Sequence, residues 1–173
     1  MNLSTKEKES MEKIKLHKTR IDLDIETREQ LVALLNQQLA DTFDLYSQTK
    51  QAHWNVKGAQ FFQLHELFDK LATDLLINVD DIAERSTTLG GTALGTAKMA
   101  AKASRLADYP AAVISGNESL DTLIDRYATL AASTREAIEV SAKLGDADTS
   151  DLFTGISRAL DKSLWFLEAH LQA

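Results

Sequence analysis

Two pairs of metal-binding side chains recur at helical spacing in the segment from His53 to Glu84. His65 and Asp69 are four residues apart, and so are Asp80 and Glu84. Residues four apart share a face of a helix, and at 100° per residue these four fall within a sector of about 100°. Imidazole and carboxylate together suit iron, manganese or zinc rather than calcium. The segment therefore predicts a transition-metal site.

The length of the helix limits how these residues could meet. His65 and Glu84 would lie about 28 Å apart along one helix, and Asp69 and Asp80 about 16 Å apart. Metal–ligand bonds are about 2 Å long, so one ion cannot use both ends. Either the two pairs are unrelated, or a two-fold axis sets one end against the other end of a second copy. His53 precedes the loop before this helix and can fold back beside His65.

The motifs HWNVKG, FxxLHELFD and DDIAER, the last followed by LGG, begin at His53, Phe61 and Asp80. In this order they resemble the Dps family, the DNA-binding proteins from starved cells, which are small ferritin-like cage proteins. The resemblance extends from about Leu31 to Leu171. It implies a four-helix bundle with a short extra helix in the middle connection, assembled as a hollow homo-dodecamer.

The resemblance also implies a site and an activity. The ferroxidase ligands would be His53, His65 and Asp69 of one subunit with Asp80 and Glu84 of its two-fold mate. Each site would bind two Fe ions, with Zn or Mn as substitutes, and would oxidise Fe(II), preferably with hydrogen peroxide. Ferric oxide would be stored inside the cage, and DNA would be protected from oxidative damage under stress.

Two residues close to this site have two interpretations each. Lys50 lies one helical turn before His53; it either acts behind the metal ligands, as the resemblance implies, or is a solvated surface lysine. Trp54 adjoins the site and is either part of the core or, by resemblance, a residue that intercepts oxidising equivalents.

Four aspartates are candidates for an iron-entry pore. Asp146, Asp148 and Asp151 cluster at a helix start, where capping and helix-dipole effects alone would favour them. Asp125 is a pore candidate by resemblance. The family often has further acidic or amide residues a few positions later, whereas Ala132 and Ser133 stand here.

Composition predicts a single helical domain. The 173 residues include one proline and no cysteine, so thiolate metal sites and disulfides are excluded. No apolar run approaches the ~18 residues of a membrane span, and the N-terminus lacks an apolar signal core. We therefore expect a cytoplasmic protein, in the bacterial cytoplasm and nucleoid, with no membrane partner.

Charge is distributed unevenly along the chain. Residues 1–20 contain six basic residues and three glutamates, a net charge of +3. The whole chain carries −7, so residues 21–173 carry −10. We predict a flexible basic arm over residues 1–20 and a bundle domain over 21–173. The alternative function is a nucleoid protein that binds and compacts DNA through this arm, weakly and only at low salt. The candidate DNA contacts are Lys6, Lys8, Lys13, Lys15, Lys18 and Arg20.

Apolar periodicity predicts four long helices and one short helix. The first follows a capping-box pattern at Thr27 and runs to about His53 or Trp54; the second runs from about Phe61 to Gly90. A short helix is expected over Thr96–Ser104. The third long helix begins after Ser115 and stops near Gly145, and the fourth is capped by Asp148. Inward-facing residues of the fourth are expected to be Leu152, Ile156, Ala159, Leu167 and Leu171.

Overall fold

The computed structural model describes residues 16–172, and this part of the chain is all-α. It contains five helices: α1 (Ile25–Asn55), α2 (Phe61–Thr88), α3 (Ala97–Ala103), α4 (Gly116–Lys143) and α5 (Ala147–Glu168). The expected bundle with one short extra helix is confirmed. Within the described range, none of the helices is both long and apolar enough to cross a membrane.

Of the three caps predicted for the long helices, one is confirmed and two are wrong. Ser115 caps α4: its hydroxyl accepts from the Glu118 N–H at 3.4 Å and donates to the Glu118 carboxylate at 2.6 Å. The predicted Thr27 cap of α1 is wrong, because Asp24 is the cap and accepts from the Thr27 N–H at 2.8 Å. Asp148 is likewise not the cap of α5; Asp146 is.

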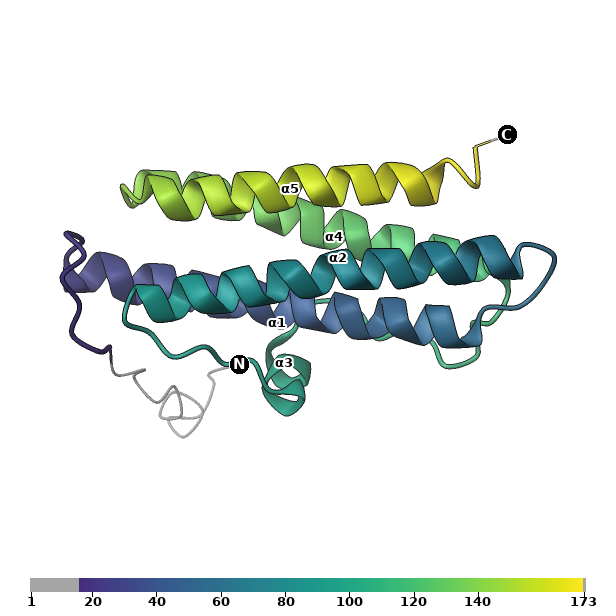
Figure 1. Ribbon diagram of the computed structural model, residues 1–173, viewed down its shortest axis with the longest axis horizontal. Helices are drawn as coiled ribbons and strands as arrows, with labels where there is room; N and C mark the ends of the chain where they lie inside the picture. The colour runs from purple at the N-terminus through teal and green to yellow at the C-terminus, as the bar shows by residue number, and fades with distance from the viewer. Residues whose placement is uncertain (1–15, 173) are drawn as a thin grey trace, which may run out of the picture.

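The helices form two antiparallel hairpins that pack against each other. Figure 1 shows α1 beside α2 in one layer and α4 beside α5 in the other, with α3 on the outside of α1. The long connection that contains α3 returns from one end of the bundle to the other, and a hydrogen bond from the Lys57 N–H to the Ile114 carbonyl (2.8 Å) ties it beside the α1–α2 loop. This is the topology of a bundle with one long crossover.

The core lies between the two hairpins. Large buried side chains come from every long helix, among them Leu35, Phe68, Tyr127 and Phe153. The predicted stripe of α5 is partly wrong: Ile156 and Leu167 are buried, whereas Ala159 and Leu171 are exposed. Burial of apolar area is the main stabilising contribution to such a bundle.

The chain before α1 is attached to the start of the long connection. The His17 N–H donates to the Gly90 carbonyl at 2.7 Å. Arg28 donates to the carbonyls of Leu89 (3.1 Å), Leu23 (3.3 Å) and His17 (3.4 Å). Leu16 packs against the core. The described end of the predicted arm is therefore held on the bundle, and residues 1–15 lie outside the described residues.

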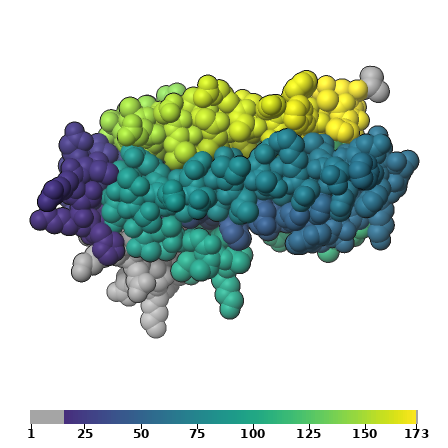
Figure 2. Space-filling model, in the orientation of Figure 1, coloured from purple at the N-terminus to yellow at the C-terminus, as the bar shows by residue number. Residues whose placement is uncertain are grey.

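Helix α2 is open to solvent along one face. In Figure 2 it runs across the viewed face between α5 and the region of α3. Leu76 and Ile77, in the middle of α2, are exposed despite being large and apolar. The face of α2 thus offers apolar surface between its two pairs of candidate ligands.

Candidate metal centre

His53 and His65 meet where α1 ends and α2 begins. Their rings stack with centroids 3.8 Å apart and planes inclined by 20°. Nδ1 of His53 bonds to the His65 carbonyl at 2.8 Å, and Nδ1 of His65 bonds to the His53 carbonyl at 2.9 Å. A carbonyl oxygen only accepts, so each Nδ1 carries a hydrogen, and the Nε2 atoms are the nitrogens left to bind a metal. Both rings are thus oriented as metal-ligating histidines usually are, with the second nitrogen tied to a carbonyl.

The stacked rings limit how the histidines can share metal ions. Each lone pair lies in its ring plane, and a metal–nitrogen bond is about 2 Å long. An ion shared by both rings would have to lie in both ring planes, within one bond length of each Nε2. The ring centroids are 3.8 Å apart and the planes are inclined by only 20°, so the planes do not converge that close to the rings. Without a ring movement, the two imidazoles therefore cannot bind the same ion.

Asp69 lies beside the histidines, where it is held by Lys50. Its Oδ1 is 2.6 Å from the Lys50 Nζ and 3.8 Å from the His53 Nε2. The Lys50 hydrogen bond lowers the pKa of Asp69 from its usual value, helped by the positive charge of Lys50 and opposed by desolvation. The carboxylate is therefore ionised and lies within reach of the free nitrogen of His53.

Phe61 also contacts this group, and the sequence reasoning missed it. Its ring centroid is 5.1 Å from that of His65. The missed signal was the four-residue spacing between Phe61 and His65, which places both on one face of α2. The phenyl ring packs against the imidazole and helps to fix its orientation.

Asp80 and Glu84 lie far from this cluster on the same helix. From Asp69 to Asp80 the helix rises about 16 Å. Both side chains are exposed, and within residues 16–172 neither takes part in an ion pair or a side-chain hydrogen bond. In the same range, no three histidine, aspartate or glutamate residues lie together as a possible metal site. One chain thus places His53, His65 and Asp69 near the start of α2, but not close enough together to hold one ion. Asp80 and Glu84 lie apart from them, farther along the same helix.

Asp146 is a buried structural residue. It is 4% exposed, and both of its carboxylate oxygens accept from Arg85 Nη2 at 2.8 Å. Burial alone would raise the pKa of Asp146, but hydrogen bonds from Thr149 and Arg85 outweigh it and lower the pKa. Within a protomer this carboxylate is occupied by Arg85 and Thr149, and its pore role stays a prediction. Sequence reasoning missed Arg85, since an arginine on an amphipathic helix has no local signal of burial.

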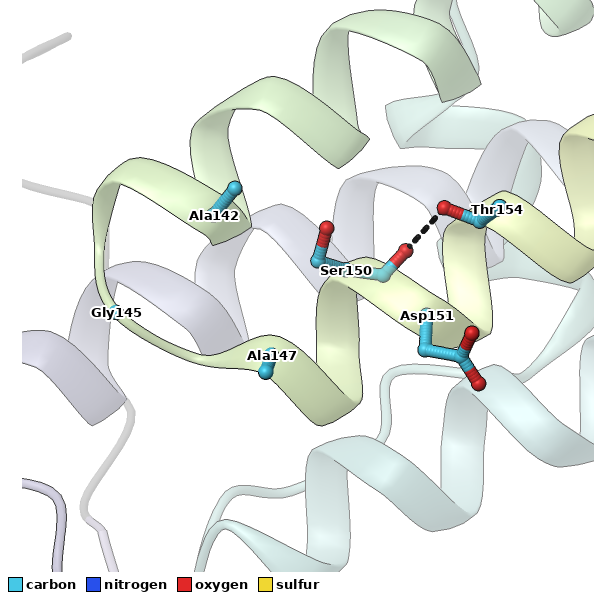
Figure 3. Close-up of a pocket in the computed structure, with 6 residues that line it drawn as sticks. All are labelled: Ala142, Gly145, Ala147, Ser150, Asp151 and Thr154. Carbon is cyan, nitrogen blue, oxygen red and sulfur yellow. Dashed lines mark hydrogen bonds between the residues drawn. The ribbon is translucent and has the colours of Figure 1, made fainter.

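The other three pore candidates are exposed and do not come together in one chain. Asp148 is 85% exposed and lies 3.9 Å from Arg85, and Asp125 lies on the exposed face of α4. Asp151 lines a shallow cavity of about 380 Å³ at the α4–α5 turn. Figure 3 shows it beside Ser150 and Thr154, whose hydroxyl donates to the Ser150 carbonyl at 2.8 Å. Pore roles for these residues stay predictions.

The DNA-contact candidates are divided by the limit of the described residues. Lys6, Lys8, Lys13 and Lys15 lie outside it. Lys18 and Arg20 are exposed on the segment that Gly90 and Arg28 hold against the bundle. Their role in DNA binding stays a prediction.

The helical bundle defines the class of protein. Residues 32–173 match the family model of the ferritin-like domain. The chain is 47% identical over 159 residues to the DNA protection during starvation protein of Agrobacterium fabrum, which covers 92% of this chain and 98% of that protein. It is 33% identical to DNA protection during starvation protein 2 of Bacillus anthracis, over 82% of this chain and 97% of that one.

Solved structures agree with these relatives. DpsC from Streptomyces coelicolor superposes with a TM-score of 0.88 at 31% identity, covering 91% of this chain and 92% of that chain. The Dps protein from Vibrio cholerae O1, described as a member of a broad superfamily of ferritin-like diiron-carboxylate proteins, gives 0.85 at 31% identity over 91% and 99%. This chain belongs to the Dps family of ferritin-like proteins.

Proposed function

We propose that this protein oxidises Fe(II) to Fe(III) at sites shared between two chains and stores the ferric product inside a dodecameric cage. The observation that carries the proposal is the pair of histidines whose Nε2 atoms are left free beside the ionised Asp69. Iron is the substrate of this reaction. The Vibrio cholerae Dps protein, described as a member of a superfamily of diiron-carboxylate proteins, supports the choice of metal.

The spacing of the candidate ligands along α2 supports a two-fold site. His65 and Glu84 are equidistant from the point midway between residues 74 and 75, and so are Asp69 and Asp80. A second α2 running antiparallel about that point would set each His65–Asp69 pair against a partner pair of carboxylates. Leu76 and Ile77 lie beside the same point and are exposed in one chain, so pairing would also bury apolar surface.

The ligand chemistry favours iron oxidation. Carboxylates stabilise the higher charge of Fe(III), and imidazole nitrogens suit iron in both states. The stacked rings offer one Nε2 to each of two ions. Two Fe(II) ions supply the two electrons that reduce hydrogen peroxide, with two protons, to two waters. No hydroxyl radical is released, and this is why peroxide is the oxidant we expect.

Fe(II) oxidation measured with peroxide and, separately, with oxygen tests the proposal. We expect the peroxide reaction to be faster and the iron to stay soluble. His65→Ala should be nearly inactive, whereas His170→Ala should match the wild type, because His170 also bonds its Nδ1 to a backbone carbonyl (2.7 Å) but lies on the last turn of the chain. Oxidation no faster with peroxide would refute the detoxification role. Equal rates for His65→Ala and wild type would refute the ferroxidase site.

DNA protection is the related role, which we place in the bacterial cytoplasm and nucleoid. The names of the relatives from Agrobacterium fabrum and Bacillus anthracis support it. The alternative function, compaction of DNA by the arm, is limited by charge: the arm carries +3, while residues 21–173 carry −10. An acidic body repels phosphate. We therefore propose iron oxidation as the main function and DNA binding as weak and salt-dependent.

A further inference from the structure

Lys50 lies between two groups of the metal centre. Its Nζ is 2.6 Å from Asp69 Oδ1 and 5.6 Å from the centre of the Trp54 ring. Lys50 and Trp54 are four residues apart on α1, so their side chains share one face of that helix. The Lys50 side chain is only 18% exposed, although Trp54 is 66% exposed. One ammonium group therefore contacts a candidate metal ligand and an indole ring at the same time.

A metal ion on Oδ1 of Asp69 would compete with the Lys50 ammonium for the same oxygen. A metal–oxygen bond is about 2 Å long, and the ammonium is 2.6 Å from the same carboxylate. Two cations on one carboxylate would lie within a few ångströms of each other, where like charges repel strongly. Among the described residues, Asp69 is the only acidic partner of Lys50. A displaced ammonium would thus lose its only acidic contact within the chain.

We propose that Lys50 is a positioning residue that couples metal occupancy at Asp69 to the surroundings of Trp54. In the empty site, Lys50 holds the carboxylate and lies over the indole. When a divalent cation binds, the ammonium leaves Asp69 and leaves the indole with it. The inference rests on the proposed metal centre, but it assigns Lys50 a coupling role that iron oxidation itself does not require.

Two measurable consequences follow. An ammonium in contact with an indole quenches its fluorescence by proton transfer to the excited ring, so its departure should raise the emission of Trp54. The ammonium also competes with the metal for Asp69, so its removal should tighten metal binding. A lysine that only supported the local fold would have the opposite effect on affinity.

Zinc titration of the assembled protein tests the coupling without redox chemistry. Trp165→Phe removes the other tryptophan, so that emission reports Trp54 alone. In this background, saturable zinc binding should raise the emission. With Lys50→Met added, emission should begin high and stay unchanged, and zinc should bind more tightly by equilibrium dialysis. Lys50→Arg keeps the positive charge and should retain a response.

Lys162→Met is the matched control, because Lys162 Nζ lies over Phe166 at the same 5.6 Å and, among the described residues, forms no ion pair with a candidate metal ligand. It should alter neither the response nor the affinity. Three results would overturn the coupling but leave the metal centre standing. They are an equal emission rise with and without Lys50, weaker zinc binding in Lys50→Met, and zinc binding with no change in emission. Absence of zinc binding in the Trp165→Phe protein would overturn the proposed metal centre and the coupling with it.

Discussion

Asp146→Ala should be strongly destabilising, because this aspartate has two structural roles. It caps α5, where its side chain accepts from the Thr149 N–H at 3.3 Å, and both of its carboxylate oxygens accept from Arg85 Nη2. Arg85 directly follows Glu84 on α2. The pair therefore fastens the end of α2 that carries two candidate ligands to the start of α5.

The magnitude follows from these two contributions. Loss of a helix cap costs about 1 kcal/mol, and removal of one partner of a buried ion pair costs about 3–5 kcal/mol. The Arg85 side chain is 16% exposed and can still reach Asp148, now 3.9 Å away. We therefore expect the lower end, a total of about 4 kcal/mol, which lowers Tm by roughly 8–16 °C for a chain of this size.

Thermal unfolding at one fixed protein concentration measures this effect, since assembly makes Tm concentration-dependent. Asp148→Ala is the control: its side chain is 85% exposed, so its effect should stay within about 0.5 kcal/mol. The pKa of Asp146 is lowered by folding, so its contribution is present above the unfolded pKa and is lost as the pH falls through the folded value. A Tm for Asp146→Ala equal to that of Asp148→Ala at neutral pH would refute the reasoning.

Two further predictions concern the N-terminal region. A Cβ at Gly90 (φ +86°) would lie 2.5 Å from the His17 carbonyl oxygen, whereas one at Gly145 (φ +82°) would meet nothing within 4 Å. Both substitutions incur the left-handed backbone cost of about 1–2 kcal/mol, so Gly90→Ala should lower Tm more than Gly145→Ala. Equal Tm values would contradict the docking of residue 17. DNA retardation should occur only at low salt and should be lost in a variant that lacks residues 1–20; unchanged retardation by that variant would show that the arm is not the contact.

The sequence predicted the histidine pairing but not the way it is held. Periodicity placed His53 at the end of one helix and His65 near the start of the next, so a short loop had to bring them together. The reciprocal bonds to backbone carbonyls depend on the path of residues 56–60, which no pattern of residue types specifies. The Lys50–Asp69 contact was missed for the same reason, because it joins two helices.

The errors at the helix starts have a local cause and a distant one. Asp24 and Thr27 both suit a cap, and the pattern alone favoured the threonine with a glutamine three residues later. At α5, Asp146 and Asp148 are equally suitable by type. Arg85, 61 residues away in the chain, fixes the choice by pairing with Asp146, and such a contact is not encoded by local spacing.

The shared active site is the central claim, and mixing two defective variants tests it most directly. One variant carries His53→Ala and His65→Ala, and the other carries Asp80→Ala and Glu84→Ala. Each alone should be nearly inactive in Fe(II) oxidation, because each lesion breaks every site. After the two are co-refolded in equal amounts, about half of the dimers should be mixed, and each mixed dimer should hold one intact site.

Activity should therefore return to about a quarter of wild type if pairing across the isologous interface is random. If every site lay within one chain, no intact site could form in any mixture. Mass spectrometry of the refolded material would establish that mixed dimers are present. Recovery to about a quarter is the result that the shared-site account predicts, and no recovery in material that contains mixed dimers would contradict it.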